Sequence, residues 1–294
     1  MQGRNILITG GTAGIGRATA NQLARMGARL LLVGRDREKA EAAVSEAIRS
    51  SGSNAVSFLQ ADLSLMSEVR RVAEHVRKTF DQLDVLVHSA GGVFPLQRTL
   101  TDEGLEMSFA VGTLARFVLT NELLDPLRAA PAPQVLSVAG AGAGFGRVDF
   151  DNLNGEKSYS MFGAVAKFAG TNDLLTLEQI VRYHDITFYN YGPGPVRTAL
   201  LMGTLPMRLF FNTLGRPFSR SPEQVSNDIV TLISGDYPGG FYGRSLKRNE
   251  PSAITGDEAS HVRLWNYSET LVDKLLAQPA AGFRDHKLAP ASFP

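Results

Sequence analysis

No cysteine occurs among the 294 residues of this chain, and histidine occurs five times. Without cysteine the protein can form no disulfide, no cysteine–zinc site and no thiol nucleophile, which fits an intracellular setting. The five histidines show no paired spacing of the kind that metal sites use, so we predict that the protein binds no metal.

Excess charge and long apolar runs are also lacking. The 30 Lys and Arg residues nearly balance the 29 Asp and Glu residues, which leaves a formal net charge of +1. So small an excess gives no broad field for binding nucleic acid or an anionic membrane. We find no apolar run of the ~20 residues that span a bilayer, and no signal-peptide layout. The sequence therefore predicts a soluble, cytoplasmic protein with no nucleic-acid or membrane partner.

Short apolar segments of strand length alternate with segments of helical periodicity along the chain. Strands that are apolar on both faces, separated by amphipathic helices, predict an α/β fold with a doubly wound parallel sheet and helices on both faces. We expect a single domain over residues 1–276 and a mobile tail over 277–294. The expected strands are 5–8, 29–33, 55–59, 84–87, 134–138 and 186–189, and the expected helices are 14–26, 36–49, 64–79 and 160–182.

A glycine-rich turn, Thr9-Gly10-Gly11-Thr12-Ala13-Gly14-Ile15-Gly16, joins the first expected strand to the first expected helix. Glycines let the backbone approach a pyrophosphate, and the helix N-terminus offers it free N–H groups and a positive dipole end. A glycine cluster alone also suits a plain structural turn, but its place between strand and helix favours nucleotide binding. The residues predicted to bind the nucleotide here are Gly10, Thr12, Gly14, Ile15 and Gly16.

The end of the second expected strand predicts which nucleotide binds. An acidic residue here would hold the ribose 2′-hydroxyl of NAD, but the position is Gly34, and Arg35 follows it. A guanidinium suits the 2′-phosphate of NADP, although a solvated Arg at a strand end is the alternative. Asp36 is expected to cap the next helix rather than to bind the ribose. The sequence therefore favours NADP(H) as the cofactor.

Three further motifs follow the expected strands. Asp62-Leu63 comes after the third strand, Ser89-Ala90-Gly91 after the fourth, and Pro193-Gly194-Pro195-Val196-Arg197-Thr198 after the last. Together with the glycine-rich turn, these motifs make residues 4–245 similar to the short-chain dehydrogenase/reductase family. Residues 32–40 and 109–111 resemble its retinol-dehydrogenase-type branch.

The resemblance implies a Rossmann-type fold and a role for each motif. Asp62 and Leu63 match the family pair that lies beside the adenine ring. Ala90 and Gly91 match the family's Asn-Ala-Gly motif, with Ser89 in place of the Asn, and are implied to line the cofactor. The residues implied to hold the nicotinamide carboxamide are Pro193, Gly194, Val196 and Thr198.

The same resemblance identifies a depleted catalytic set. In the family, Asn positions a proton-relay water, Ser orients the substrate, Tyr donates a proton, and Lys lowers the Tyr pKa and binds the nicotinamide ribose. Gly112, Gly140 and Gly163 stand at the first three positions, and Lys167 alone matches. Lys167 is therefore implied to be a ribose ligand, with a catalytic role as the alternative. Tyr159, ahead of the long helix, is either a displaced proton donor or an ordinary half-buried aromatic residue.

Other polar residues near the expected pocket offer substitute proton donors. They are Arg98, Asp149, Asp151 and Lys157. For each of them, a solvated loop charge is the more common role. His88, at the end of the fourth strand, is expected to be a packed, hydrogen-bonded histidine.

Residues 198–218, the substrate-covering segment in the family, carry many large apolar side chains, and the small residues Gly142, Gly144 and Gly146 form a rim opposite. So much apolar surface in a soluble protein faces a ligand, a core or a partner. We therefore expect a bulky apolar small-molecule substrate, with a subunit interface as the alternative. Family members commonly pair through the long helix, here 160–182, which implies a homodimer or homotetramer.

The missing proton donor argues against routine ketone reduction, because a positioned acid is worth about 10²–10⁴-fold in rate. A pre-activated acceptor, such as an iminium or a conjugated carbonyl, needs only orientation and hydride delivery. The sequence therefore predicts an NADP(H)-dependent oxidoreductase of unconventional mechanism in secondary metabolism. Two alternatives stay open: a cofactor-assisted, non-redox cyclase or isomerase of a biosynthetic pathway, and a nucleotide-binding pseudoenzyme.

Overall fold

The computed structural model describes residues 1–92, 94–142, 148–197, 219–251 and 258–277. Thr198, the expected substrate-covering segment 198–218, and the rim residues Gly144 and Gly146 lie outside the described residues. The predicted tail also lies outside them from residue 278 onwards.

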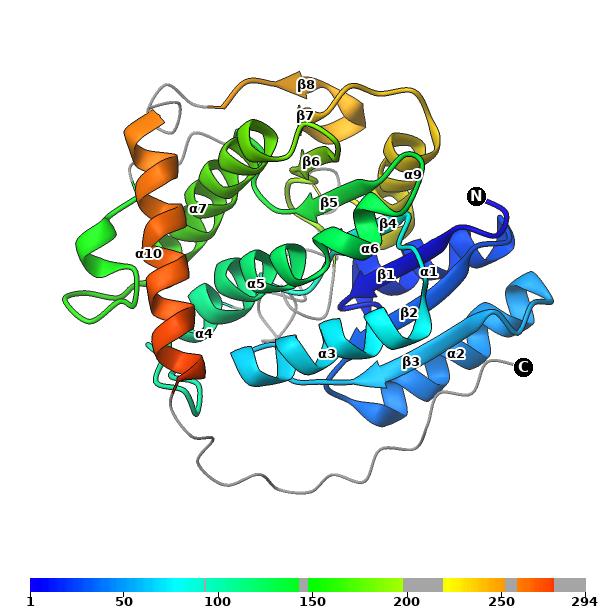
Figure 1. The fold of residues 1–294 in the computed structure, drawn as a ribbon, viewed down its shortest axis with the longest axis horizontal. Helices are drawn as coiled ribbons and strands as arrows, with labels where there is room; N and C mark the ends of the chain where they lie inside the picture. Colours follow the sequence, from blue (N-terminus) through cyan, green and yellow to red (C-terminus); the bar gives the residue numbers. More distant parts are fainter. Residues whose placement is uncertain (93, 143–147, 198–218, 252–257, 278–294) are drawn as a thin grey trace.

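One sheet of eight strands forms the centre of the described part of the chain (Figure 1). Its order is β3-β2-β1-β4-β5-β6-β7-β8, and all neighbours are parallel except β7 and β8. The order reverses between β1 and β4. The strands are β1 (Asn5–Thr9), β2 (Arg29–Gly34), β3 (Val56–Gln60), β4 (Val85–His88), β5 (Gln134–Val138), β6 (Thr187–Tyr191), β7 (Gly240–Tyr242) and β8 (Arg248–Asn249).

Helices cover both faces of this sheet (Figure 1). On one face α1 packs against α2 and α9, and on the other lie α3, α5 and α7. The described helices are α1 (Gly14–Arg25), α2 (Arg37–Ser51), α3 (Met66–Thr79), α4 (Met107–Phe109), α5 (Ala115–Glu122), α6 (Leu124–Arg128), α7 (Met161–Arg182), α9 (Pro222–Ser234) and α10 (Glu258–Leu276). The short turns are η1 (Ala110–Leu114), η2 (Phe150–Asn152) and η4 (Arg244–Leu246).

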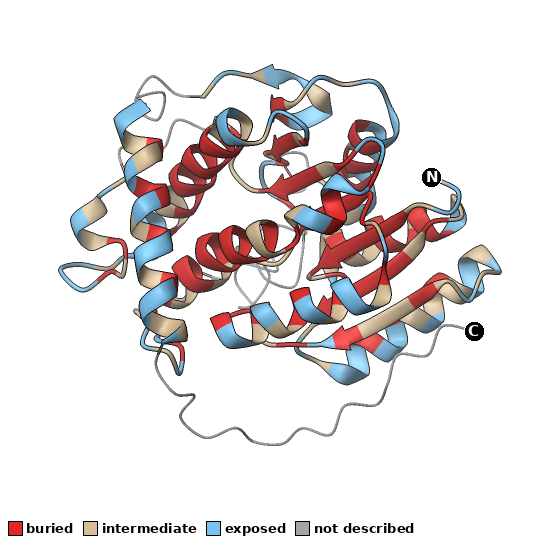
Figure 2. Cartoon of the chain, viewed as in Figure 1, coloured by how far each residue is buried: buried red, intermediate tan, exposed pale blue. Residues whose placement is uncertain are grey.

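The alternation of side chains along β1 shows how one strand supplies two cores. Ile6 and Ile8 join the core beneath α1 and α9, and Leu7 joins the core beneath α3 and α5. All three are 0% exposed, and Figure 2 shows the central strands in the red of buried residues. The predicted Rossmann-type, doubly wound α/β fold is therefore confirmed. The expected elements begin and end within two residues of the observed ones.

Helix α10 is an addition for which the sequence analysis assigned no element. Trp265 packs edge-on against Phe117 of α5, with ring centroids 4.8 Å apart, and the Arg182 guanidinium of α7 lies 4.5 Å from its ring centroid. His261 Nδ1 hydrogen-bonds with the buried carboxylate of Glu178. In Figure 1, α10 crosses the outer side of the layer that contains α7.

This position of α10 bears on assembly. The part of α7 that α10 covers is not free to pair with a second subunit. The implied homodimer or homotetramer therefore stays a prediction, and any pairing through α7 needs the surface that α10 leaves open. None of the helices in the described residues combines the length and apolar character needed to cross a membrane.

We expect Trp265→Ala to lower the free energy of unfolding by about 3–5 kcal/mol, because it empties a site that is only 2% exposed. Equilibrium urea unfolding, followed by circular dichroism, measures the change. The neighbouring exposed variant Asn266→Ala is the matched control and should change the free energy by less than about 0.5 kcal/mol. A loss in Trp265→Ala no larger than in the control would show that α10 lies outside the cooperative fold.

Candidate functional site

The residues predicted to bind the cofactor gather at one edge of the sheet, beyond the carboxyl ends of β1, β2, β3, β4 and β6. In doubly wound sheets, ligands bind outside this edge at the point where the strand order reverses. The reversal between β1 and β4 is such a point. The sheet therefore brings together segments that are far apart in the sequence: 10–16, 34–35, 62–63, 89–91 and 193–197.

The glycine-rich turn lies directly against the end of β4. Gly10 has a φ of +68°, and a Cβ there would stand 2.8 Å from the backbone nitrogen of Ala90. A Cβ on Gly16 would collide with the carbonyl oxygen of Gly10. The Ala90 N–H donates to Thr9 Oγ1 at 3.3 Å, and the Gly10 N–H donates to the Val33 carbonyl at 2.8 Å. The turn therefore keeps a compact form that only glycine allows at these two positions.

The N-terminus of α1 carries no side-chain cap. Its N-cap residue, Ala13, makes no side-chain hydrogen bond, and the first turn contains no acidic residue. The helix begins at Gly14, whose φ is +51°, and continues through Ile15. Uncapped N–H groups at the positive end of a helix dipole favour an anion. The residues of this turn therefore fit the pyrophosphate of a dinucleotide.

The end of β2 has no room for the acidic residue that an NAD site uses. A Cβ on Gly34 would stand 2.8 Å from Thr12 Oγ1, so the buried Thr12 occupies the space of a side chain at position 34. Arg35 is exposed, and its guanidinium makes no hydrogen bond or ion pair with the described residues. Asp36 caps α2 by accepting a hydrogen bond from the Lys39 N–H at 3.0 Å, which confirms the capping role expected for it.

The two remaining cofactor motifs flank this edge. Asp62 follows β3 and accepts a hydrogen bond from the Ser64 N–H at 3.0 Å, and Leu63 is buried. Beyond β6, Gly194 has a φ of +69°, and Val196 is buried and bridges to Arg220. Pro193 is buried beside them. The roles implied for these residues stay predictions, and the role of Thr198 falls outside the described residues.

The three glycines that the family resemblance places at catalytic positions differ in surroundings. A Cβ on Gly112 would stand 2.5 Å from the Phe168 ring, which fills the space of the family's Asn. Gly140 follows β5, and its carbonyl oxygen would stand 3.1 Å from a Cβ on Gly192. Gly163 is exposed in the first turn of α7, where its N–H donates to Ser160 Oγ at 3.0 Å. None of the three positions supplies an acid.

Lys167 has a structural partner. Its Nζ donates to Glu106 Oε2 at 2.8 Å and to the Leu153 carbonyl at 2.7 Å. The side chain of Glu106 is 0% exposed and also accepts hydrogen bonds from Ser108. Burial works to raise the pKa of Glu106, but the hydrogen bonds from Lys167 and Ser108 hold it below its usual value. The positive charge of Lys167 is therefore balanced by the carboxylate of Glu106. The implied binding of the ribose by Lys167 stays a prediction.

Tyr159 is not prepared as a proton donor in this arrangement. Its hydroxyl donates to the Pro95 carbonyl at 2.9 Å. Burial, and then the negative charge of Glu106, raise its pKa. A tyrosine that serves as an acid benefits from a lowered pKa, so its catalytic role stays a prediction without electrostatic support.

The structure adds a buried cluster that the sequence analysis did not single out. Arg116 of α5 donates to the carbonyls of Ala90 and Val138 and to Asn172 Oδ1. Its guanidinium carbon lies 5.0 Å from the ring centroid of Phe168. The only signal in the sequence is a charged residue inside the apolar run 109–119.

Asp173 on α7 holds the loop that follows Gly140. Its carboxylate accepts hydrogen bonds from the Gly142 N–H at 3.1 Å and from Asn190 Nδ2 at 2.9 Å. Burial raises the pKa of Asp173 to about 7. The carboxyl group therefore connects α7, β6 and the end of β5.

The other candidate donors have ordinary structural roles. Asp149 caps η2, and Asp151 is exposed and lies within 3.5 Å of Arg263. Lys157 is exposed, and Arg98 Nε donates to the Asn154 carbonyl at 2.8 Å. His88 is buried, with Nε2 2.9 Å from Thr120 Oγ1, as expected. Burial, and then the charge of Arg116, lower its pKa well below the usual value, so it is neutral.

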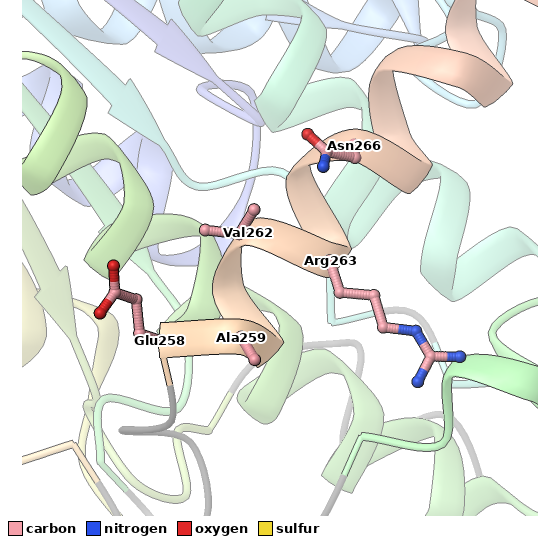
Figure 3. A pocket seen from close by; sticks show the side chains of 5 residues that line it. All are labelled: Glu258, Ala259, Val262, Arg263 and Asn266. Carbon is pink, nitrogen blue, oxygen red and sulfur yellow. The ribbon is translucent and has the colours of Figure 1, made fainter.

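Two hollows lie along α10. The first is lined by side chains of α10, which Figure 3 shows along one stretch of the helix: Glu258, Ala259, Val262, Arg263 and Asn266. The second, of about 400 Å³, lies between the C-terminal half of α10, the turn at 103–105 and the loop at 150–156. Within the described residues, none of the predicted cofactor residues lines either hollow.

Comparison with known proteins gives one consistent result. Residues 4–208 match the family model described as short chain dehydrogenase. The protein of Streptomyces sp. (strain C5) named "Putative daunorubicin C-13 ketoreductase DnrU" is 36% identical over 279 residues, which cover 92% of this chain and 93% of that protein. Human retinol dehydrogenase 14 is 31% identical over 296 residues, which cover 94% and 88% of the two chains.

A solved structure shares the fold. The crystal structure of an uncharacterized protein from Mycobacterium paratuberculosis superposes with a TM-score of 0.73 at 27% identity. The match covers 92% of this chain and 94% of that chain.

We expect Arg35→Ala to weaken NADPH binding by about tenfold or more and NADH binding by less than about twofold, because only NADPH carries the 2′-phosphate. Titrations of nucleotide-stripped protein, followed by nicotinamide fluorescence, give both dissociation constants. Arg37→Ala is the matched control, since Arg37 is also exposed but pairs with Glu41. Equal losses for both nucleotides would refute the assignment.

We expect Lys167→Met to lower the free energy of unfolding by about 3–5 kcal/mol, because it leaves Glu106 buried without a counter-charge. The double variant Glu106→Gln/Lys167→Met should recover much of this loss, since no buried charge remains. Urea unfolding measures both changes. NADPH titration of the same variants separates the two roles: a tenfold loss of affinity in both would instead support Lys167 as a ribose ligand.

Proposed function

Because the chain belongs to the short-chain dehydrogenase/reductase family, whose members are NAD(P)-dependent oxidoreductases, we propose that it is an NADP(H)-dependent reductase of pre-activated acceptors. The acceptor is a bulky, apolar small molecule that presents an iminium or a conjugated carbonyl. The observation that carries the proposal is the loss of the proton donor together with an intact glycine-rich turn.

The choice of NADP(H) is supported by the end of β2. Thr12 excludes an acidic side chain at Gly34, and Arg35 is left with an exposed guanidinium that has no partner among the described residues. A 2′-phosphate would supply that partner through charge-assisted hydrogen bonds. Arg35 would bind the 2′-phosphate of the cofactor, and the uncapped N-terminus of α1 would bind its pyrophosphate.

The choice of acceptor is supported by what the site does not offer. NADPH supplies a hydride when it is bound. A neutral ketone also requires a proton on its oxygen, and Gly112, Gly140 and Gly163 supply none. An iminium carries its positive charge into the reaction and becomes a neutral amine when hydride adds to its carbon. A conjugated carbonyl accepts hydride at its β-carbon to give an enolate, whose delocalised charge needs no acid in the transition state and which takes its proton from water after release. The task left to the protein is to bind the acceptor, to orient it toward the nicotinamide and to exclude water from the site.

A bulky apolar substrate is supported by exposed side chains near the predicted pocket. Leu96 is 77% exposed and Phe162 is 79% exposed, which makes them the two most exposed large apolar residues of the described part of the chain. The hydrogen bond from Tyr159 to Pro95 joins their two segments.

The test compares three acceptors of one bulky skeleton, namely an iminium, a conjugated ketone and a saturated ketone, each mixed with NADPH and followed by nicotinamide absorbance. We expect the first two to turn over, and the saturated ketone to react about 10²-fold more slowly or less, because no acid assists it. The Arg35→Ala variant is the control, since it should raise the KM for NADPH without changing the ranking of acceptors.

Three outcomes would contradict the proposal. Rapid reduction of the saturated ketone would mean that a proton donor is present. Product formation with NADP⁺ and no absorbance change would identify a cofactor-assisted cyclase or isomerase. Tight NADPH binding with no conversion of any acceptor would identify a nucleotide-binding protein without turnover.

A further inference from the structure

Arg116 of α5 lies close to Gly112, one of the positions where the family has a polar side chain. It is one helical turn beyond Gly112, and it is 4% exposed. Its Nη2 donates to the Ala90 carbonyl at 2.8 Å, just beyond β4, and to the Val138 carbonyl at 2.9 Å, at the last residue of β5. Its Nη1 donates to Asn172 Oδ1 at 2.9 Å on α7. One guanidinium therefore joins the ends of two strands to both helices that carried the family's polar set.

All of these partners are neutral. No carboxylate pairs with Arg116 among the described residues, and its Nε is buried there without a hydrogen-bond partner. Burial lowers the pKa of Arg116 to about 9, which still leaves the guanidinium protonated at neutral pH. A buried charge with neutral partners lowers the stability of the fold, because it has lost its hydration without gaining an opposite charge. For the same reason its electrostatic effect on neighbouring groups is not cancelled. Lys167, in contrast, is neutralised by Glu106.

The charge lies close to the predicted cofactor edge. A Cβ on Gly91 would stand 3.0 Å from Arg116 Nη2, and Gly91 has a φ of +127°, which a residue with a side chain rarely adopts. Gly91 and Ala90 are the residues predicted to line the cofactor beyond β4. The guanidinium therefore lies directly against the backbone of Gly91, and a side chain at position 91 would have to displace it.

Phe168 seals the other side of the guanidinium. Its ring lies 5.0 Å from the Arg116 guanidinium carbon, fills the space above Gly112, and meets Phe94 edge-on at 5.5 Å. Two aromatic rings in place of the family's amide exclude water from this side of the cation. A charge in such surroundings acts over a longer range than one in solvent.

We propose that Arg116 is a positioning residue for the nicotinamide end of the cofactor, and that its uncancelled charge, rather than the paired charge of Lys167, sets the electrostatic field there. The proposal rests on the proposed function, because it presumes that a nicotinamide binds at this edge. A fixed positive charge disfavours the cationic, oxidised nicotinamide and leaves the neutral, reduced form unaffected. It also stabilises the negative charge that develops on the oxygen of a conjugated carbonyl and disfavours a cationic iminium beside the same edge, so of the two proposed acceptors it favours the conjugated carbonyl.

The test is the ratio of the dissociation constants for NADP⁺ and NADPH, measured by calorimetric titration. In the unaltered protein we expect NADPH to bind about tenfold more tightly than NADP⁺ or better. Arg116→Gln should lower this ratio about tenfold, the size expected for one charge acting over ~10 Å at an effective dielectric constant of ~20. Arg116→Lys keeps the charge and should keep the ratio within about twofold.

Asn172→Ala is the matched control for the structural role of the cluster. It removes a hydrogen-bond partner of Arg116 but no charge, so it should lower stability and leave the ratio unchanged. An unchanged ratio in Arg116→Gln, at any loss of stability, would reduce Arg116 to a clamp between β4 and β5 and overturn the proposal. If Arg116→Gln fails to fold, the unaltered protein decides, since equal or tighter binding of NADP⁺ would also overturn it.

The same titrations separate this proposal from the proposed function. If neither NADPH nor NADP⁺ binds, the proposed reductase function is wrong. Tight binding of both nucleotides, with a ratio that Arg116→Gln does not change, would leave the reductase in place and remove only the role of Arg116.

Discussion

The cofactor edge depends on one backbone contact, between Gly10 at the end of β1 and Ala90 at the end of β4. A side chain on Gly10 would force these two strand ends apart at the point where the strand order reverses. The same tight turn brings Thr12 over Gly34, and this excludes an acid from the end of β2. The Gly10–Ala90 contact, which lets the ends of β1 and β4 lie side by side where the strand order reverses, therefore also shapes the site at the end of β2 that we expect to select the nucleotide.

The loss of the family's polar residues is compensated inside the core. The Phe168 ring occupies the space over Gly112, so an Asn side chain and this ring cannot both be present. Asn172 donates to the Gly112 carbonyl at 2.9 Å and accepts from Arg116, which ties the Gly112 position to Arg116 through hydrogen bonds. At Gly112 the vacated space is therefore filled by a packed aromatic ring.

The sequence could predict what local pattern determines. Short apolar runs and helical periodicity located the predicted strands and helices within two residues, and the strand–glycine–helix order located the phosphate turn. It could not predict that α10 docks through Trp265, because that helix is stabilised by rings on α5 and α7 that are distant in the sequence. The partner of Lys167 was equally hidden, since Glu106 lies 61 residues earlier in the chain.

Lys167 shows why a matching motif does not establish a function. Its position in the chain agrees with the family, yet the electrostatic effect of an ammonium depends on whether a carboxylate cancels it. Glu106 cancels it here, and the uncancelled cation at the cofactor edge belongs to Arg116 on a different helix. A sequence alignment compares residues one position at a time. The electrostatic potential at the site depends instead on all nearby charges, on which of them are paired, and on how deeply each is buried. Lys167 matches the family motif in the sequence, but the positive charge without a carboxylate partner lies on Arg116.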